Sequence, residues 1–231
     1  MKFKKIFALL LLLSLCLSST ACGERYAPLH TYEADGLTYT VRGNNGRPRQ
    51  IVVKLGETVV WQQAVNVNRK VGNYKNCYGF EIMDLNFDGT KDVVLTVKLD
   101  GDVADVRCWL WNSEKNTFRF SEELSSLNNV MADKNMKAIF AFEHEYVFRE
   151  ATKDLPDTYV STDKVTKYVW ANGALIPERR VSLSYESEHK FYVYSIENYN
   201  EDTAAYDEPK ETYLSEEEYR NTDFSFFYYF K

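Results

Sequence analysis

Apolar and polar side chains alternate along much of the chain from residue 36 onward, which is the pattern of half-buried β-strands. Leu37, Tyr39 and Val41 alternate with polar residues up to a Gly/Asn turn, "GNNG", at 43–46. Further alternating or β-branched runs stand at 49–55, 58–65, 77–83, 92–99, 105–112, 137–143, 146–151, 167–185 and 190–196. We therefore expect an all-β fold, an antiparallel meander arranged as a propeller-like structure or a sandwich.

The end of the chain has a different pattern. It turns acidic and aromatic from about residue 198, and Ser215 with Glu218 makes the capping-box pattern that begins one short helix at 215–221. The run "FSFFYYF" at 224–230 then predicts a last strand. About 200 residues suffice for one core, so we expect a single β domain over 36–231.

The composition supports strands and argues against one class of partner. The chain has 17 Tyr and 14 Phe among 231 residues, and aromatic residues favour strands. Its net charge is −6 and its pI is near 5.3. Phosphate binding needs a basic face, so we expect no nucleic acid as a partner.

The N-terminal segment has the features of an export signal. Three lysines precede an apolar run from Ile6 to Leu17, which is too short to span a membrane comfortably. Small residues then precede Cys22, which resembles the lipobox of bacterial lipoproteins, with Ser19 where Leu is usual. The resemblance implies a signal peptide at 1–21, acylation of Cys22 and a membrane anchor, followed by a tether at 22–35. The alternative is an ordinary signal peptide with a soluble product.

One strand, "DVRCWLWN" at 105–112, is apolar on both faces. Val106, Cys108 and Leu110 face one way, and Trp109 and Trp111 face the other. A sheet stacked between two neighbours explains this pattern, and both tryptophans then belong to the core. The alternative is a stacking platform for sugar formed by Trp109 and Trp111, which would make the chain a glycan-binding surface module.

The stretch "DLNFDGTKD" at 84–92 carries the clearest chemistry. Side-chain oxygens at positions 1, 3 and 5, a Gly at position 6, a backbone carbonyl at position 7 and a carboxylate at position 9 suit a calcium ion. The predicted ligands are Asp84, Asn86, Asp88, Thr90 and Asp92. An EF-hand would need Glu at position 12, where the chain has Leu95, and would need flanking helices. The alternative is a hairpin in which Asp, Asn and Gly serve turn geometry alone.

This loop and its flanks resemble bacterial lipoproteins that carry one calcium loop of the FG-GAP or integrin type, DxNxDGxxD. The likeness continues through Trp109–Trp111, Phe118 and the segment 122–127, and covers about sixty residues. It implies a small propeller-like β fold that lies in the periplasm or at the cell surface and acts by binding a protein or glycan of the envelope. Some members protect cells against lysozyme-type effectors, which implies an inhibitor-like or immunity-like role.

The cysteines leave two alternatives. Cys16 belongs to the signal, Cys22 is the lipidation candidate, and Cys77 and Cys108 remain in the domain. An exported chain can oxidise such a pair. Simple meander pairing would place Cys77 and Cys108 two strands apart, beyond the roughly 7 Å Cα limit for a bridge, so two buried thiols are the alternative to a disulfide.

Catalytic motifs are scarce. His30, His144 and His189 show no HExxH-type spacing, and the chain has no GxSxG or CxxC. Glu143 and Glu145 share a face opposite His144, which favours a solvated strand edge over acid/base chemistry. We expect a lipid-anchored, calcium-stabilised binding protein without catalytic residues, and an undetected hydrolase with distant acidic residues is the alternative.

Overall fold

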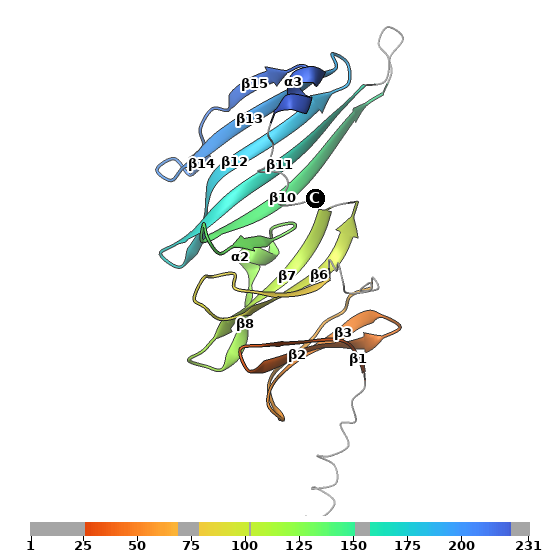
Figure 1. Ribbon diagram of the computed structural model, residues 1–231, viewed down its shortest axis with the longest axis vertical. Helices are drawn as coiled ribbons and strands as arrows, with labels where there is room; N and C mark the ends of the chain where they lie inside the picture. The colour runs from red at the N-terminus through yellow and green to blue at the C-terminus, as the bar shows by residue number, and fades with distance from the viewer. Residues whose placement is uncertain (1–25, 69–78, 102, 151–157, 223–231) are drawn as a thin grey trace, which may run out of the picture.

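The computed structural model describes residues 26–68, 79–101, 103–150 and 158–222. Three antiparallel sheets follow one another along the chain and along the long axis of the molecule (Figure 1). We name them sheet A, sheet B and sheet C in that order. The expectation of an all-β antiparallel fold with a short C-terminal helix is confirmed.

Sheets A and B are four-stranded meanders in which each strand pairs with its neighbours in sequence. Sheet A consists of β1 (Ala27–Ala34), β2 (Leu37–Asn44), β3 (Arg47–Leu55) and β4 (Thr58–Ala64). Sheet B consists of β5 (Phe80–Met83), β6 (Asp92–Asp100), β7 (Val103–Asn112) and β8 (Thr117–Ser121), followed by the short helix α2 (Glu122–Ser125).

Sheet C is larger and also antiparallel. Its strands are β9 (Met131–Asp133), β10 (Ala138–Arg149), β11 (Thr158–Ala171), β12 (Ala174–Glu186), β13 (Phe191–Asn200), β14 (Ala205–Tyr206) and β15 (Lys210–Leu214). Both β14 and β15 pair with β13. The helix α3 (Glu216–Asn221) follows, with the predicted capping box between Ser215 and Glu218.

Tight turns join several of the hairpins. Asp35-Gly36, Asn45-Gly46 and Asn172-Gly173 each place two successive residues at positive φ. This is the geometry of type I′ turns, whose twist matches that of the flanking strands, and Asp-Gly and Asn-Gly are the pairs that adopt it most readily. The turn residues therefore fix the register of the hairpins.

Two sequence predictions of local structure were wrong. The expected tether at 22–35 includes β1, which pairs with β2 from Ala27 to Ala34. Tyr32 and Ala34 pack against the core between sheets A and B, and this apolar contact holds the strand in place. The two strands expected at 137–143 and 146–151 are one continuous strand, β10, because pairing with β11 continues through Glu143, His144 and Glu145.

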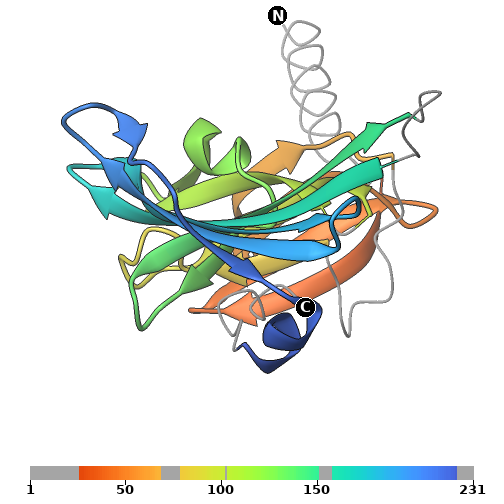
Figure 2. The ribbon, with the colours of Figure 1, turned by 90° about the horizontal axis from the view of Figure 1, so that it is seen from above.

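Sheet B lies between the other two sheets, and both of its faces are buried. One core cluster joins it to sheet A, and includes Tyr39, Val41, Ile51, Val53, Phe80, Val93, Leu95, Trp109 and Phe118. The other joins it to sheet C, and includes Leu85, Val94, Val106, Cys108, Leu110, Leu124, Val130 and Ile139. Seen along the long axis, strands of sheet C cross over those of the two sheets below (Figure 2).

The alternation expected for "DVRCWLWN" is present. Trp109 belongs to the cluster against sheet A, whereas Cys108 and Leu110 belong to the cluster against sheet C. The calcium-like loop leaves β5 and enters β6, so it lies at one end of the sheet that both clusters share.

Candidate metal-binding loop

The loop between β5 and β6 is a tight turn organised by its own side chains. Phe87 and Gly89 have positive φ, at 58° and 89°. The amide of Asp88 donates to Asn86 Oδ1 over 3.3 Å, and the amide of Thr90 donates to Asp88 Oδ1 over 2.8 Å. Asn86 Nδ2 donates to Asp88 Oδ2 over 2.8 Å. Asn86, Asp88 and Thr90 are therefore brought together, as the sequence predicted.

Asp92 is the buried end of the loop. Asp92 is 0% exposed. Its Oδ2 accepts a hydrogen bond from the backbone amide of Leu85 over 2.7 Å, and its Oδ1 accepts one from the backbone amide of Trp111 over 2.8 Å. Burial raises the pKa of the Asp92 carboxyl to about 7, although both amide bonds act in the opposite direction and the nearby Asp88 and Asp84 add to the rise. Asp92 thus ties the start of the loop to β7.

Asp84 stands at the other end of the loop. Its Oδ2 accepts from the amide of Gly89 over 3.0 Å, which closes the turn. Its Oδ1 is buried, and no hydrogen-bond partner for that atom exists among the residues that the structure describes. A buried carboxylate oxygen without a donor is costly, since it loses water without compensation. A cation is one group that would satisfy it.

The exposed Asp88 behaves differently from Asp92. Burial acts to raise its pKa, but hydrogen bonds from the side chain and amide of Thr90 and from Asn86 outweigh it, so the pKa of Asp88 lies below its ordinary value. The carboxylate of Asp88 is therefore held in its charged form. Its Oδ1 accepts two hydrogen bonds from Thr90, whereas Oδ2 accepts one from Asn86 and keeps a further lone pair.

The sequence did not indicate how the loop is attached to sheet C. Trp170 of β11 donates from Nε1 to the backbone oxygen of Leu85 over 2.8 Å, and the Leu85 side chain is fully buried in the cluster between sheets B and C. Phe87 packs against the same cluster. The contact joins residues 85 positions apart, so no local pattern could have revealed it.

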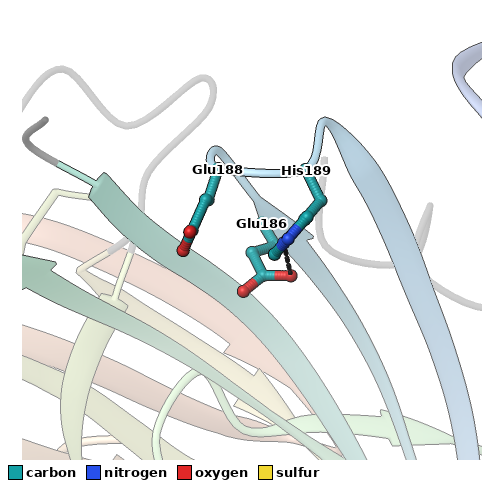
Figure 3. A group of neighbouring side chains, drawn as sticks. All are labelled: Glu186, Glu188 and His189. Carbon is teal, nitrogen blue, oxygen red and sulfur yellow. Dashed lines mark hydrogen bonds and ion pairs between the residues drawn. The ribbon is translucent and has the colours of Figure 1, made fainter. Parts of the chain in front are cut away.

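A second group of possible ligands lies at the turn between β12 and β13, outside the predicted loop. Glu186, Glu188 and His189 place ligand atoms within 4.8 Å of one another, and the three side chains converge in Figure 3. His189 Nδ1 lies 3.2 Å from Glu186 Oε2, and Glu188 and His189 are exposed. Among the described residues, the three loop aspartates do not converge to that degree.

The proposed sugar platform is wrong for one tryptophan and unsupported for the other. Trp109 is only 4% exposed, and its ring packs against Trp61 of sheet A. Trp111 is half-buried, with its ring 4.9 Å from that of Phe118. Apolar contact between sheets A and B therefore accounts for both rings, because each faces the neighbouring sheet.

The cysteine alternatives are partly decided. Cys108 is a free thiol, fully buried in the cluster against sheet C, and burial raises its pKa far above the ordinary value. Cys77 and Cys22 lie outside the described residues, as does the rest of the predicted signal peptide. No helix in the described ranges is long and apolar enough to cross a membrane.

His144 does not form an acid/base pair with its sequence neighbours. Its Nδ1 lies 2.7 Å from Asp163 of β11, whereas Glu145 accepts from Lys164 on the opposite face of the sheet. Both pairs are exposed cross-strand contacts, and such pairs contribute little to stability. This arrangement agrees with a solvated strand rather than a catalytic centre.

Comparisons with known proteins give no family. No protein-family model matches the chain, and no curated protein matches it. Among solved structures, the chain is similar to a "Xanthomonas Type IV Secretion System related protein", with 16% identity and a TM-score of 0.46. The match covers 81% of this chain and 96% of that one. A likeness at this score carries no argument about function.

Proposed function

We propose that this chain is a non-catalytic binding protein of the bacterial envelope in which the loop 84–92 holds calcium as a structural ion. The observation that carries the calcium part is the buried, unsatisfied Oδ1 of Asp84 in a loop that also contains the fully buried Asp92. Asn86, Asp88 and the backbone carbonyl of Thr90 supply the remaining oxygens of the sequence pattern.

The residues of the loop fit a hard cation. All of the candidate ligand atoms are oxygens, and two or three carboxylates at one turn repel each other unless positive charge offsets them. A bound calcium ion would supply that charge. The chain's own residues do the rest: Asp92 fixes the loop to β7, and Trp170 fixes it to sheet C.

The role proposed for the ion is to stabilise the fold, not to react. Its site lies at one end of sheet B, beside the cluster between sheets B and C. A structural metal that binds only the folded chain stabilises that state by RT ln(1 + [L]/Kd). The envelope location and the anchor at Cys22 rest on the sequence pattern of the leader, and the partner is a protein or glycan of the envelope.

Thermal unfolding with and without calcium tests the ion. At an affinity on the order of 0.1 to 1 mM, 10 mM calcium adds roughly 1 to 3 kcal/mol to the free energy of unfolding, and magnesium adds much less. Asp88→Ala removes a ligand, keeps the turn glycine and should abolish the response. The double variant Glu186→Gln/Glu188→Gln should keep it.

The outcomes show whether the loop binds an ion or only forms a turn. A melt of the wild type that shifts neither with calcium nor with chelator would show that the loop is only a turn. A response lost in the Glu186/Glu188 variant but kept in Asp88→Ala would place the ion at the turn between β12 and β13. The anchor is tested apart from the ion: a fatty-acid analogue should label the wild type and not Cys22→Ser.

A further inference from the structure

The loop between β5 and β6 has two faces, because residues of two kinds alternate along it. The candidate ligands Asp84, Asn86 and Asp88 occupy every second position, and the residues between them, Leu85 and Phe87, are apolar. Leu85 belongs to the cluster between sheets B and C, and Phe87 packs against the same cluster. One face of the loop therefore carries oxygen ligands, and the other is embedded in the junction with sheet C.

Leu85 is held from three directions. Its side chain is fully buried, its amide donates to Asp92 Oδ2 over 2.7 Å, and its backbone oxygen accepts from Trp170 Nε1 over 2.8 Å. Each peptide group is planar, so the bond to the amide orients the unit that leads back to Asp84, and the bond to the oxygen orients the unit that leads on to Asn86. The first bond comes from within the loop, and the second comes from sheet C.

The indole that reaches Leu85 is carried by the hairpin of β11 and β12. Trp170 is paired with Leu175 across the two strands, and both side chains pack against the cluster between sheets B and C. The hairpin closes at the type I′ turn of Asn172 and Gly173, which fixes its register. The orientation of the peptide group between Leu85 and Asn86 therefore depends on how sheet C is docked.

We propose that Trp170 is a positioning residue for the calcium site: through Leu85 it holds the loop in the shape that binds the ion, and bound calcium in turn favours the docked arrangement of sheets B and C. The inference rests on the proposed calcium site and adds the control of its affinity. Such coupling is reciprocal, since the factor by which docking tightens calcium binding equals the factor by which calcium tightens docking. The site is thus built by sheet B and tuned by sheet C.

Calcium titration of Trp170→Phe tests the positioning role. The variant keeps most of the aromatic surface and removes the donor to the oxygen of Leu85. We expect the dissociation constant for calcium, measured by calorimetry on the folded chain, to rise about two- to tenfold, which is the range for one hydrogen bond. A bond that only stabilises the fold would lower the free energy of unfolding equally in calcium and in chelator. It would leave the dissociation constant unchanged, and that result would overturn the proposal.

Two further chains separate the lost donor from a general loss of packing. In the first, benzothienylalanine replaces Trp170; it keeps the bicyclic shape, has sulfur in place of the N–H group, and should weaken calcium binding as Trp170→Phe does. In the second, Trp61→Phe makes the same change between sheets A and B, where Trp61 packs against Trp109 and Phe118. Its calcium affinity should equal that of the wild type. Full affinity with the sulfur analogue, or an equal loss in Trp61→Phe, would contradict the positioning role.

The wild type separates this inference from the calcium proposal itself. If the wild-type chain neither binds calcium in the titration nor shifts its thermal melt, the loop holds no ion and both proposals fall. If the wild type binds calcium and Trp170→Phe binds it equally well, the ion site stands and only the role of Trp170 falls. Support requires weaker binding by Trp170→Phe together with a smaller gain in its free energy of unfolding on addition of calcium.

Discussion

Two turns of this molecule collect acidic side chains, and they do so in opposite ways. At 84–92 the carboxylates are fastened to backbone amides, and Asp92 is fully buried. At 186–189 the ligand atoms lie closer together as a group, but two of the three residues are exposed, and His189 contacts Glu186 through their side chains.

The difference shows that proximity of ligand atoms is a weak guide to a site. Exposed carboxylates can separate into water at little cost, so nothing requires an ion between them. A buried carboxylate oxygen without a donor cannot relax in that way, and Asp84 Oδ1 is such an atom within the described residues. We therefore place the candidate ion in the first turn, although its aspartates converge less closely.

The largest effect is expected where the first turn is fastened. Asp92→Ala leaves the amides of Leu85 and Trp111 buried without their acceptor, at about 1 to 3 kcal/mol each. The unfolding temperature should fall by roughly 5 to 20 °C for a domain of this size. The matched change in the second turn, Glu188→Ala, should stay within about 0.5 kcal/mol in the same thermal melt. Similar losses in the two variants would remove the distinction between the turns.

The pH dependence of the free energy of unfolding, measured in the presence of chelator, tests the burial of Asp92 in the first turn. Because burial raises the pKa of Asp92 from 3.8 to about 7, the folded chain binds this proton more tightly than the unfolded chain does between these values. The free energy of unfolding should therefore fall as the pH rises through this window. Among the predicted effects, only the destabilisation caused by Asp92→Ala should be larger. Urea unfolding between pH 5 and 8 measures it, and this range stays above the titration of Asp88, whose pKa is lowered.

The matched variant for this measurement is Asp92→Asn, which keeps an oxygen acceptor and cannot titrate. Its stability should lose the downward slope that the wild type shows. A wild-type slope of the opposite sign, equal to that of Asp92→Asn, would mean that the buried carboxyl stays charged throughout. Added calcium should reduce the slope, because a cation favours the charged form.

The smallest of these effects concerns the link to sheet C. Trp170→Phe removes the Nε1–H that donates to the oxygen of Leu85 and keeps most of the aromatic surface. We expect a loss of about 0.5 to 1.5 kcal/mol in urea unfolding. No measurable change would mean that this hydrogen bond does not help to hold the first turn.

The sequence predicted the local features of the molecule better than its long-range ones. Alternation of apolar and polar residues located β2 to β7, because it depends only on the two-residue period of a strand, and the same period separated the two faces of "DVRCWLWN". The tether at 22–35 was wrong because "APLHTYEA" is polar enough for a linker, and only its pairing with β2 makes it a strand. Tertiary contact overrides composition at such edges.

The candidate loop shows the same division. Spacing alone placed Asp84, Asn86, Asp88, Thr90 and Asp92 in one turn, and the structure brings the central three into contact. Spacing could not show that Asp92 would be buried against the amide of Trp111, or that Trp170 would hold Leu85 from another sheet. These contacts depend on how sheets stack, which a local pattern does not encode.

The strand β10 carries a consequence for solubility. In the described chain, β9 pairs only with its first three residues, so the stretch from Glu143 onward runs along an open edge of sheet C. Tyr146, Val147 and Phe148 are exposed on that edge, and an exposed apolar edge is a template for the addition of a strand from another molecule. Glu143 and the ion-paired Glu145 place charge beside this apolar run, and charge on an edge strand opposes aggregation of that kind.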